Sequence, residues 1–215
     1  MSEVNLLDKY PQRKRDISER IAYRTPDNLR RAAKFDWEYF DMKGCCYDGY
    51  IYDGRWIPIA DNIIKQYSLN PGDKVLDIGC AKGYLVYELR RKGIDACGID
   101  ISQYAIDCAP TPVKPYVSVG DARDLSCYIS NSFDFVISLT TLPVLSEDEI
   151  GKALIEMQRI SRGKTYATFD TYETNEEKEK MLLWTLTAKT VKSKKEFIKW
   201  FKYIGWNGDY WWFVP

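Results

Sequence analysis

Short β-prone runs alternate with helical segments along the middle of this chain. The β-prone runs lie at residues 75–78, 96–99, 116–119, 133–139 and 165–169. The helical segments lie at residues 84–92, 103–108 and 147–161, and a capping-box pattern, Ser146-x-x-Glu149, opens the last of them. Strands that alternate with helices predict right-handed crossovers and a mostly parallel sheet with helices on both faces. We therefore expect an α/β protein with a Rossmann-like fold.

The first β-prone run ends in a glycine-rich turn, VLDIGCAKG, at residues 75–83. Its spacing, Asp77-x-Gly79-x-x-x-Gly83, differs from the G-x-G-x-x-G of a dinucleotide-binding turn and from a phosphate loop that ends in Gly-Lys-Ser or Gly-Lys-Thr. A pyrophosphate is favoured by helix-terminal amides, whereas an acid precedes this turn. The turn therefore favours a ligand with a cationic group, and its spacing disfavours a nicotinamide-dependent oxidoreductase.

Two further acids, Asp100 and Asp121, follow the next two β-prone runs. A carboxylate at the second strand end can accept hydrogen bonds from both hydroxyls of a ribose, and one at the third can accept from an adenine amino group. The alternative for each acid is a solvated loop carboxylate. Taken together, the three acids indicate a ligand with a cationic amino-acid end, a ribose and an adenine but no phosphate, which is S-adenosylmethionine (SAM).

In this order the motifs resemble those of the class I SAM-dependent methyltransferases, over residues 75–169. VLDIGCAKG is similar to that family's first motif, GIDIS to its second strand end, GDARDL to its adenine-side motif and FDFVISLTTLPVL to its fourth strand. The resemblance implies a class I methyltransferase fold, SAM as cofactor and S-adenosylhomocysteine as product. The cofactor-binding residues that it implies are Asp77, Gly79, Cys80, Ala81 and Gly83 at the methionine, Asp100 and Ile101 at the ribose, Asp121 and Ala122 at the adenine, and Leu139 at the floor.

A stretch rich in tyrosine and glycine, YDGYIYDGRW, occupies residues 47–56. It resembles a segment that precedes the SAM domain in a subset of bacterial small-molecule methyltransferases. Aromatic rings among glycines suit a loop that covers a ligand, and the planar fork of Arg55 suits a carboxylate or a phosphate. We expect this stretch to act as a lid, with Tyr52 and Arg55 at the cofactor. The alternative is aromatic core packing at the sheet edge.

The rest of the chain is divided around this region. Residues 1–56 are predicted to form an N-terminal helical arm and the aromatic lid loop, with a helix start at Thr25-Pro26-Asp27. Residues 57–215 are predicted to form the SAM-binding methyltransferase domain, with an acceptor-site insertion at about residues 171–192. The final GDYWWFVP is typical of one strand. The sheet then either lacks the family's seventh strand or fills it with residues 181–186.

Composition excludes several classes of function. The sequence has no histidine, so Ser-His and Cys-His nucleophile pairs are excluded. Lys plus Arg equals Asp plus Glu, at 31 each, so no bulk charge attracts nucleic acid or an anionic membrane. Six cysteines without a C-x-x-C pair, no apolar run of transmembrane length and no signal-peptide pattern predict a cytoplasmic protein with reduced thiols and no membrane partner.

The fourth strand narrows the choice of methyl acceptor. It ends in LTTLP and not in the Asn/Asp-Pro-Pro-aromatic motif of amino-methylating DNA enzymes, and no Pro-Cys nucleophile is present. We therefore expect no nucleic-acid substrate. Asp170 stands alone after the fifth run, so we expect no metal site, because a metal would need several oxygen ligands.

The remaining interpretation is methyl transfer to a polar small molecule, carried out by a monomer or a homodimer. Resemblance favours O-methylation of a sugar or a phosphorylated intermediate in bacterial capsule or lipopolysaccharide biosynthesis. Catalysis then rests mainly on holding the nucleophile in line with the methyl-sulfur bond. The candidate bases are Asp170, Glu173 and Tyr50. Two alternatives remain open: a small-molecule N-methyltransferase and a catalytically silent SAM-fold binding module.

Overall fold

A single parallel β-sheet forms the centre of the molecule. The computed structural model describes residues 1–11, 17–46 and 50–215, so Tyr47 to Gly49 of the aromatic stretch lie outside the described residues. Within them the sheet has seven strands: β1 (Lys74–Ile78), β2 (Asp95–Asp100), β3 (Val117–Val119), β4 (Phe135–Ser138), β5 (Thr165–Tyr172), β6 (Lys192–Ser193) and β7 (Asp209–Phe213). The order is β3-β2-β1-β4-β5-β6, with β7 also paired to β5. Every pair is parallel, so the carboxyl ends share one edge.

Helices cover both faces of the sheet, as the alternating pattern predicts. The main helices are α4 (Ile57–Tyr67), α5 (Tyr84–Arg91), α6 (Gln103–Asp107), α7 (Glu147–Ile160), α8 (Asn175–Trp184) and α9 (Lys194–Ile204). One core joins α4 and α5 to side chains such as Val75 and Phe135, and a second joins α7 and α9 to their sequence neighbours Leu76 and Val136. Neighbouring strand residues face opposite sides of a sheet, which explains why nearly continuous apolar runs fill two cores.

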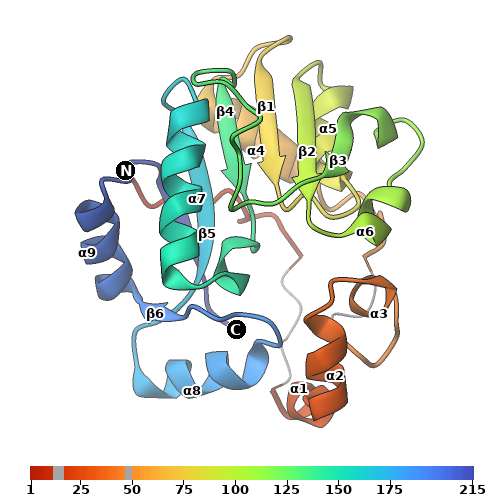
Figure 1. Cartoon of the computed structure of the whole chain (residues 1–215), viewed down its shortest axis with the longest axis vertical. Coiled ribbons are helices and arrows are strands. Elements are labelled where there is room, and N and C mark those ends of the chain that lie inside the picture. The colour runs from red at the N-terminus through yellow and green to blue at the C-terminus, as the bar shows by residue number, and fades with distance from the viewer. Residues whose placement is uncertain (12–16, 47–49) are drawn as a thin grey trace.

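The N-terminal arm lies below the carboxyl edge of the sheet. It contains α1 (Ile17–Tyr23), α2 (Pro26–Ala32) and α3 (Trp37–Phe40), and the predicted start of α2 is confirmed by a hydrogen bond from the Asn28 backbone N–H to the Thr25 hydroxyl at 3.2 Å. Figure 1 shows the strands pointing toward α1–α3 on one side and α8 on the other. The short 3₁₀ helices η1 (Lys114–Tyr116) and η2 (Leu142–Val144) complete the connections.

The seventh strand is the main correction to the sequence-based expectation. Residues 181–186 do not fill the sheet edge, because α8 runs to Trp184 from a capping box at Thr174 and Glu177. Instead, β7 pairs with β5 in parallel, and β6 pairs with the last two residues of β5, Thr171 and Tyr172. The outer edge of β7 is covered by the N-terminus, since Val4 donates its backbone N–H to the Tyr210 carbonyl at 2.9 Å. A sheet edge left unpaired is an aggregation hazard, and this pairing removes it.

Strand β5 is also longer than its pattern predicts. Asp170 was expected after the strand, but it lies within β5 and has Phe213 of β7 as its register partner. The aromatic residues of the C-terminal run pack inward, with Trp206 and Trp212 only 2% and 6% exposed. Trp206, Tyr210 and Trp212 therefore belong to the core beneath α9, while Trp211 packs against the core on the other face of the sheet.

Candidate functional site

The glycine turn after β1 holds its backbone in conformations that ordinary residues avoid. Gly79 has φ +80°, and a Cβ built there would lie 2.0 Å from Thr141 Oγ1. Gly83 has φ +72° and caps α5 against Val117. Because Gly79 has no side chain, the turn after β1 and the segment after β4 can approach closely. Glycine is often found where the backbone must come this close to a neighbour or a ligand. Gly83 does not line the cavity described below; its role is to connect the turn to the helix.

Asp100 at the end of β2 holds the same turn in place. Its carboxylate accepts the backbone N–H of Ala81 at 2.8 Å and that of Ser102 at 2.9 Å. Burial raises the pKa of Asp100 above its ordinary value, although these two donors act in the opposite direction. Each carboxylate oxygen has one further lone pair, so Asp100 can both hold the turn and accept from ribose hydroxyls.

Asp77 is a buried acid whose carboxyl group has no hydrogen-bond partner among the described residues. It is 4% exposed, and no hydrogen bond to its carboxylate occurs among the residues that the structure describes. Burial, together with the nearby negative charge of Asp100, raises the pKa of Asp77 to about 7. An acid in this condition is stabilised by any cation that reaches it. The ammonium group of the methionine moiety of SAM fits that requirement.

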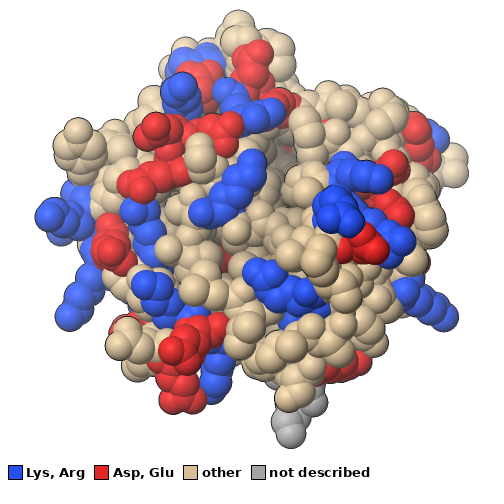
Figure 2. Space-filling view, turned by 60° about the horizontal axis from the view of Figure 1, so that its bottom comes forward, with Lys and Arg blue, Asp and Glu red and all other residues tan. Residues whose placement is uncertain are grey.

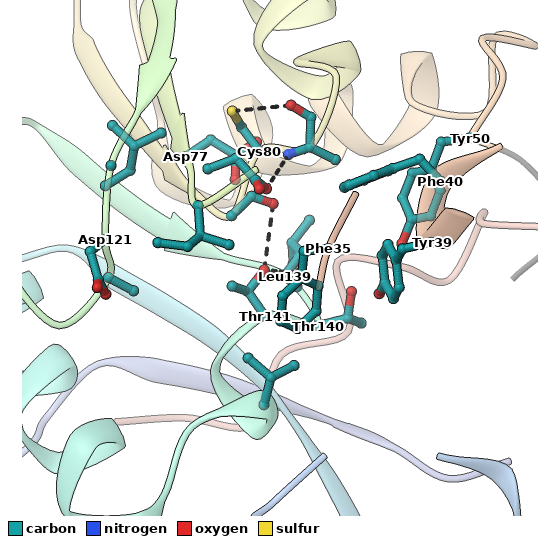
Figure 3. A pocket seen from close by; sticks show the side chains of 18 of the residues that line it. Phe35, Tyr39, Phe40, Tyr50, Asp77, Cys80, Asp121, Leu139, Thr140 and Thr141 are labelled. Carbon is teal, nitrogen blue, oxygen red and sulfur yellow. Dashed lines mark hydrogen bonds between the residues drawn. The ribbon is translucent and has the colours of Figure 1, made fainter. Parts of the chain in front are cut away.

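A cavity of about 380 Å³ opens at this edge of the sheet. One wall carries the acids Asp77, Asp100 and Asp121, and the facing wall belongs to the arm and contains Phe35, Tyr39, Phe40 and Tyr50 (Figure 3). Of the residues expected at the cofactor, the following line it: Asp77, Gly79, Cys80, Ala81, Asp100, Ile101, Asp121, Ala122 and Leu139. The structure thus brings together acids and apolar surface that can hold a ligand with a cationic end, hydroxyls and a flat ring.

Asp121 is not free in this arrangement. Arg123 donates to both of its oxygens, at 2.6 to 3.0 Å, and bridges to Glu149 of α7. The hydrogen bonds from Arg123 lower the pKa of Asp121 below its ordinary value, so the carboxylate stays ionised. Asp121 lines the adenine end of the expected site while part of its charge is used by Arg123.

Besides Gly83 and Asp170, three predicted residues do not line this first cavity. The Tyr52 hydroxyl bonds the Glu88 carboxylate on α5, and Tyr52 lines neither large cavity. Glu173 pairs with Lys194 at 3.1 Å, and its side chain is 61% exposed. Arg55 forms a two-pronged pair with Asp53, at 2.7 and 2.5 Å, and also donates to the Tyr10 hydroxyl at 3.1 Å. The expected anionic partner of Arg55 is therefore supplied within the loop itself.

A second cavity of about 330 Å³ adjoins the first. The two share the lining residues Tyr39, Tyr50, Trp56, Tyr84, Leu139, Thr140 and Val144. Asp170 and Arg55 line only the second, together with the segment after α8 that was expected to reach the acceptor. Burial raises the pKa of Asp170 to about 7. The molecule therefore offers two joined compartments, the first with three acids and the second with Asp170, which can hold two ligands side by side.

Sequence reasoning did not find the group that fastens the arm over the first cavity. Lys82, in the glycine turn, donates to both oxygens of Asp41 at 2.7 Å and to the Tyr50 carbonyl at 3.1 Å. Tyr104 of α6 also donates to Asp41, at 2.7 Å. Burial acts to raise the pKa of Asp41, but these bonds outweigh it and lower the value. No local sequence signal joins Lys82 to a residue 41 positions earlier.

We expect Lys82→Met to loosen the arm. The side chain of Lys82 is only 8% exposed, and its removal leaves Asp41 without its cation, which costs about 1 to 3 kcal/mol. Limited proteolysis should then cut the segment between α3 and α4 several times faster than in the wild type. Lys92→Met is the matched control, because Lys92 pairs with Asp61 on the surface. Equal cleavage rates in the two variants would show that Lys82 does not fasten the arm.

The surface around the site carries charges of both signs. Figure 2 shows this face of the molecule, with Lys and Arg side chains interspersed with Asp and Glu around an uncharged centre. No group of three or more potential metal ligands of the Cys, Asp and Glu types occurs in the described part of the chain. Among these residues no helix is both long and apolar enough to cross a membrane.

Several known proteins with similar sequences are named as methyltransferases. Residues 75–163 match the family model described as "Methyltransferase domain". The magnesium-protoporphyrin O-methyltransferase of Rhodobacter capsulatus is 35% identical over 92 residues, which are 40% of this chain and 40% of that protein. A second curated relative, from Methanocaldococcus jannaschii, is 32% identical over 57% of this chain and 46% of its own length. The chain thus matches less than half the length of these relatives.

Solved structures agree with the fold. A SAM-dependent methyltransferase from Archaeoglobus fulgidus has a TM-score of 0.52 at 18% identity and covers 66% of each chain. A chain from the complex of the Haloferax volcanii Trm112 methyltransferase activator with a methyltransferase-like protein has a TM-score of 0.55 at 25% identity, covering 68% of this chain and 66% of that one.

Proposed function

We propose that this chain, whose residues 75–163 match a methyltransferase domain, transfers a methyl group from SAM to a small molecule held in the second cavity. The observation that carries this proposal is the pair of joined cavities. The first contains the three acids, and the second contains a separate acid, Asp170, beside the shared wall. SAM supplies an activated methyl group on a positively charged sulfur.

The residues of the first cavity have separate tasks in this proposal. Asp77 pairs with the cofactor's ammonium group, and Asp100 accepts from the ribose hydroxyls. The arm residues Phe35 and Phe40 exclude water from the opposite wall, where they face the acids (Figure 3). Water exclusion strengthens each of these electrostatic contacts, because the local dielectric constant falls.

The acceptor lies within reach of Asp170 and Thr140 in the second cavity. Holding the nucleophile in line with the methyl-sulfur bond supplies most of the rate enhancement, on the order of several kcal/mol. Asp170 is the candidate base, because its pKa of about 7 suits proton uptake near neutral pH. Glu173 is exposed and paired with Lys194, which makes it the weaker candidate. Tyr50 borders both cavities and is placed to orient the acceptor.

The acceptor class expected from the sequence was a sugar or a phosphorylated intermediate of surface polysaccharide synthesis. A sugar face can stack on the aromatic rings of the second cavity, and a hydroxyl can donate to Asp170. A phosphate is less well supported, because the fork of Arg55 is occupied by Asp53. The six cysteines are all free thiols, which supports a reducing, cytoplasmic location.

Binding of the cofactor is the direct test of this proposal. S-adenosylhomocysteine should bind in calorimetric titration and raise the melting temperature, because it binds only the folded state. NADH should do neither. If NADH bound and S-adenosylhomocysteine did not, even at millimolar concentration, the methyltransferase proposal would fail. Normal cofactor binding with no transfer to any acceptor would instead favour the binding module.

We expect Asp100→Ala to weaken the binding of S-adenosylhomocysteine by about 1 to 3 kcal/mol, through loss of the ribose acceptor and of the bond to Ala81. Asp100→Asn should disturb the turn less and still weaken binding. Titration calorimetry measures both, with Asp107→Asn at the end of α6 as the control. Wild-type affinity in both Asp100 variants would place the ribose elsewhere.

A further inference from the structure

The second cavity contains a carboxylate without a counter-ion. No hydrogen bond or ion pair to the Asp170 side chain occurs within residues 1–11, 17–46 and 50–215. Asp170 lines the cavity, where an incoming ligand can contact it. Asp170 is partly buried, and a partly buried carboxylate without a partner is stabilised when a cation or a hydrogen-bond donor reaches it.

Aromatic rings dominate the remaining wall of this cavity. They come from the arm and from β7, and include Tyr39, Tyr50, Trp56 and Phe213. The rings of Tyr10 and Trp184 also line the cavity, but Arg55 lies over the first and Arg20 over the second. The faces of such rings carry a negative electrostatic potential that attracts cations. The carboxylate and the rings therefore favour the same kind of ligand, a compact organic cation.

The other polar groups do not reverse that preference. Arg55 is the cation that lines the cavity among the described residues, and Asp53 neutralises it with a two-pronged bond. Lys189 lines the first cavity and not the second. Apart from the phenols, the neutral polar side chains are the threonines at positions 140, 185 and 187.

We propose that the acceptor is a small primary or secondary amine, bound as its ammonium ion between Asp170 and the aromatic wall of the second cavity. This inference rests on the proposed methyl transfer and adds the chemical class of its acceptor. In the reaction the ammonium passes one proton to Asp170, and the freed nitrogen lone pair forms the bond to the methyl carbon. The carbon-sulfur bond breaks with its electron pair left on sulfur, which yields S-adenosylhomocysteine and a methylated ammonium. Asp170 then releases its proton to solvent.

Cation recognition can be measured apart from turnover with choline, whose quaternary nitrogen cannot accept a methyl group. Its uncharged isostere, 3,3-dimethylbutan-1-ol, is the matched control ligand. Titrated into protein saturated with S-adenosylhomocysteine, choline should bind at least about tenfold more tightly than the alcohol. Equal affinities would overturn the proposal.

The role of Asp170 is tested by pH and by substitution. Choline affinity should rise about fivefold to tenfold between pH 6 and pH 8, because Asp170 has a pKa of about 7 and binds the cation only when ionised. The other titratable groups that line the cavity are Arg55 and four tyrosines, and these side chains do not ordinarily change charge in this range. Asp170→Asn should remove the pH dependence and weaken choline binding about fivefold to tenfold at pH 8, while Glu176→Gln on the exposed face of α8 should change neither. Retained binding of S-adenosylhomocysteine shows that the variant is folded; wild-type choline affinity and pH dependence in Asp170→Asn would overturn the proposal.

Turnover separates this inference from the proposed function. With radiolabelled SAM, phenethylamine should be methylated in preference to 2-phenylethanol, its alcohol counterpart. Methylation of the alcohol alone would refute an amine acceptor and leave methyl transfer standing. Failure to bind S-adenosylhomocysteine would refute methyl transfer itself.

Discussion

Gly79→Ala should abolish cofactor binding and lower the free energy of unfolding by about 3 kcal/mol or more. The new Cβ would lie 2.0 Å from Thr141 Oγ1 and 2.3 Å from its Cγ2, so the turn after β1 and the segment after β4 could not keep their present separation. Both segments line the first cavity, so a shift of either one alters the cofactor site. Thermal unfolding and titration with S-adenosylhomocysteine measure the two effects.

Gly72→Ala separates backbone strain from this close approach. Gly72 also has a positive φ, +92°, but nothing lies within 4 Å of a Cβ built there. It should therefore lose only about 1 kcal/mol, the cost of the left-handed backbone conformation, and keep normal cofactor affinity. Thr141→Ala introduced beside Gly79→Ala should recover part of the lost stability. If the single variants at positions 79 and 72 behaved alike, contact with Thr141 would not be what requires glycine.

Asp77→Asn should have opposite effects on folding and on binding. Burial and the charge of Asp100 raise the pKa of Asp77 to about 7. The folded state then holds a proton more tightly than the unfolded state, so the free energy of unfolding falls as pH rises from about 4 to 7. An asparagine has no proton to lose. At pH 8 and without cofactor, the free energy of unfolding of the variant should therefore exceed that of the wild type by about 2 kcal/mol.

Cofactor binding should respond in the other direction. The variant offers no charge to the cofactor's ammonium group, and we expect its affinity for S-adenosylhomocysteine to fall by about 100-fold, or about 3 kcal/mol. In the wild type the affinity should rise between pH 6 and pH 8 as Asp77 ionises. Melting curves from pH 5 to pH 8 and titrations at the two ends measure both effects. Asp61→Asn, on the surface of α4, is the control and should change neither. A destabilised Asp77→Asn at pH 8, or one with wild-type affinity, would contradict this account of the acid.

Sequence patterns predicted the elements that depend on short-range order. The start of α2 at Thr25, the capping box before α7 and the glycine turn at Gly79 all involve residues within a few positions of one another. Their geometry follows from backbone sterics and local hydrogen bonding, so the sequence carries the signal directly. The predicted strands were recovered for the same reason, with end shifts such as the extension of β5 to Tyr172.

Contacts between residues far apart in the sequence were not predicted. Arg55 was expected to reach an anionic ligand, yet it donates to the hydroxyl of Tyr10, 45 positions earlier, at 3.1 Å. Lys82 carried no expectation, and its contact with Asp41 exists only because the arm crosses the glycine turn. The partner of a charged side chain depends on which surfaces meet, and a one-dimensional pattern does not contain that information.

The sequence by itself determined the parallel α/β sheet, the glycine turn and the acids at the strand ends, because periodicity and residue type act locally and the carboxyl ends of parallel strands share one edge. The tertiary structure alone decided that β7 joins β5 in parallel and that the N-terminus covers its edge. It also decided that Asp170 lies in a second, aromatic cavity beside the first. That cavity is built from Leu7 to Phe213, nearly the full length of the chain, and its shape and charge exist only once those segments pack together.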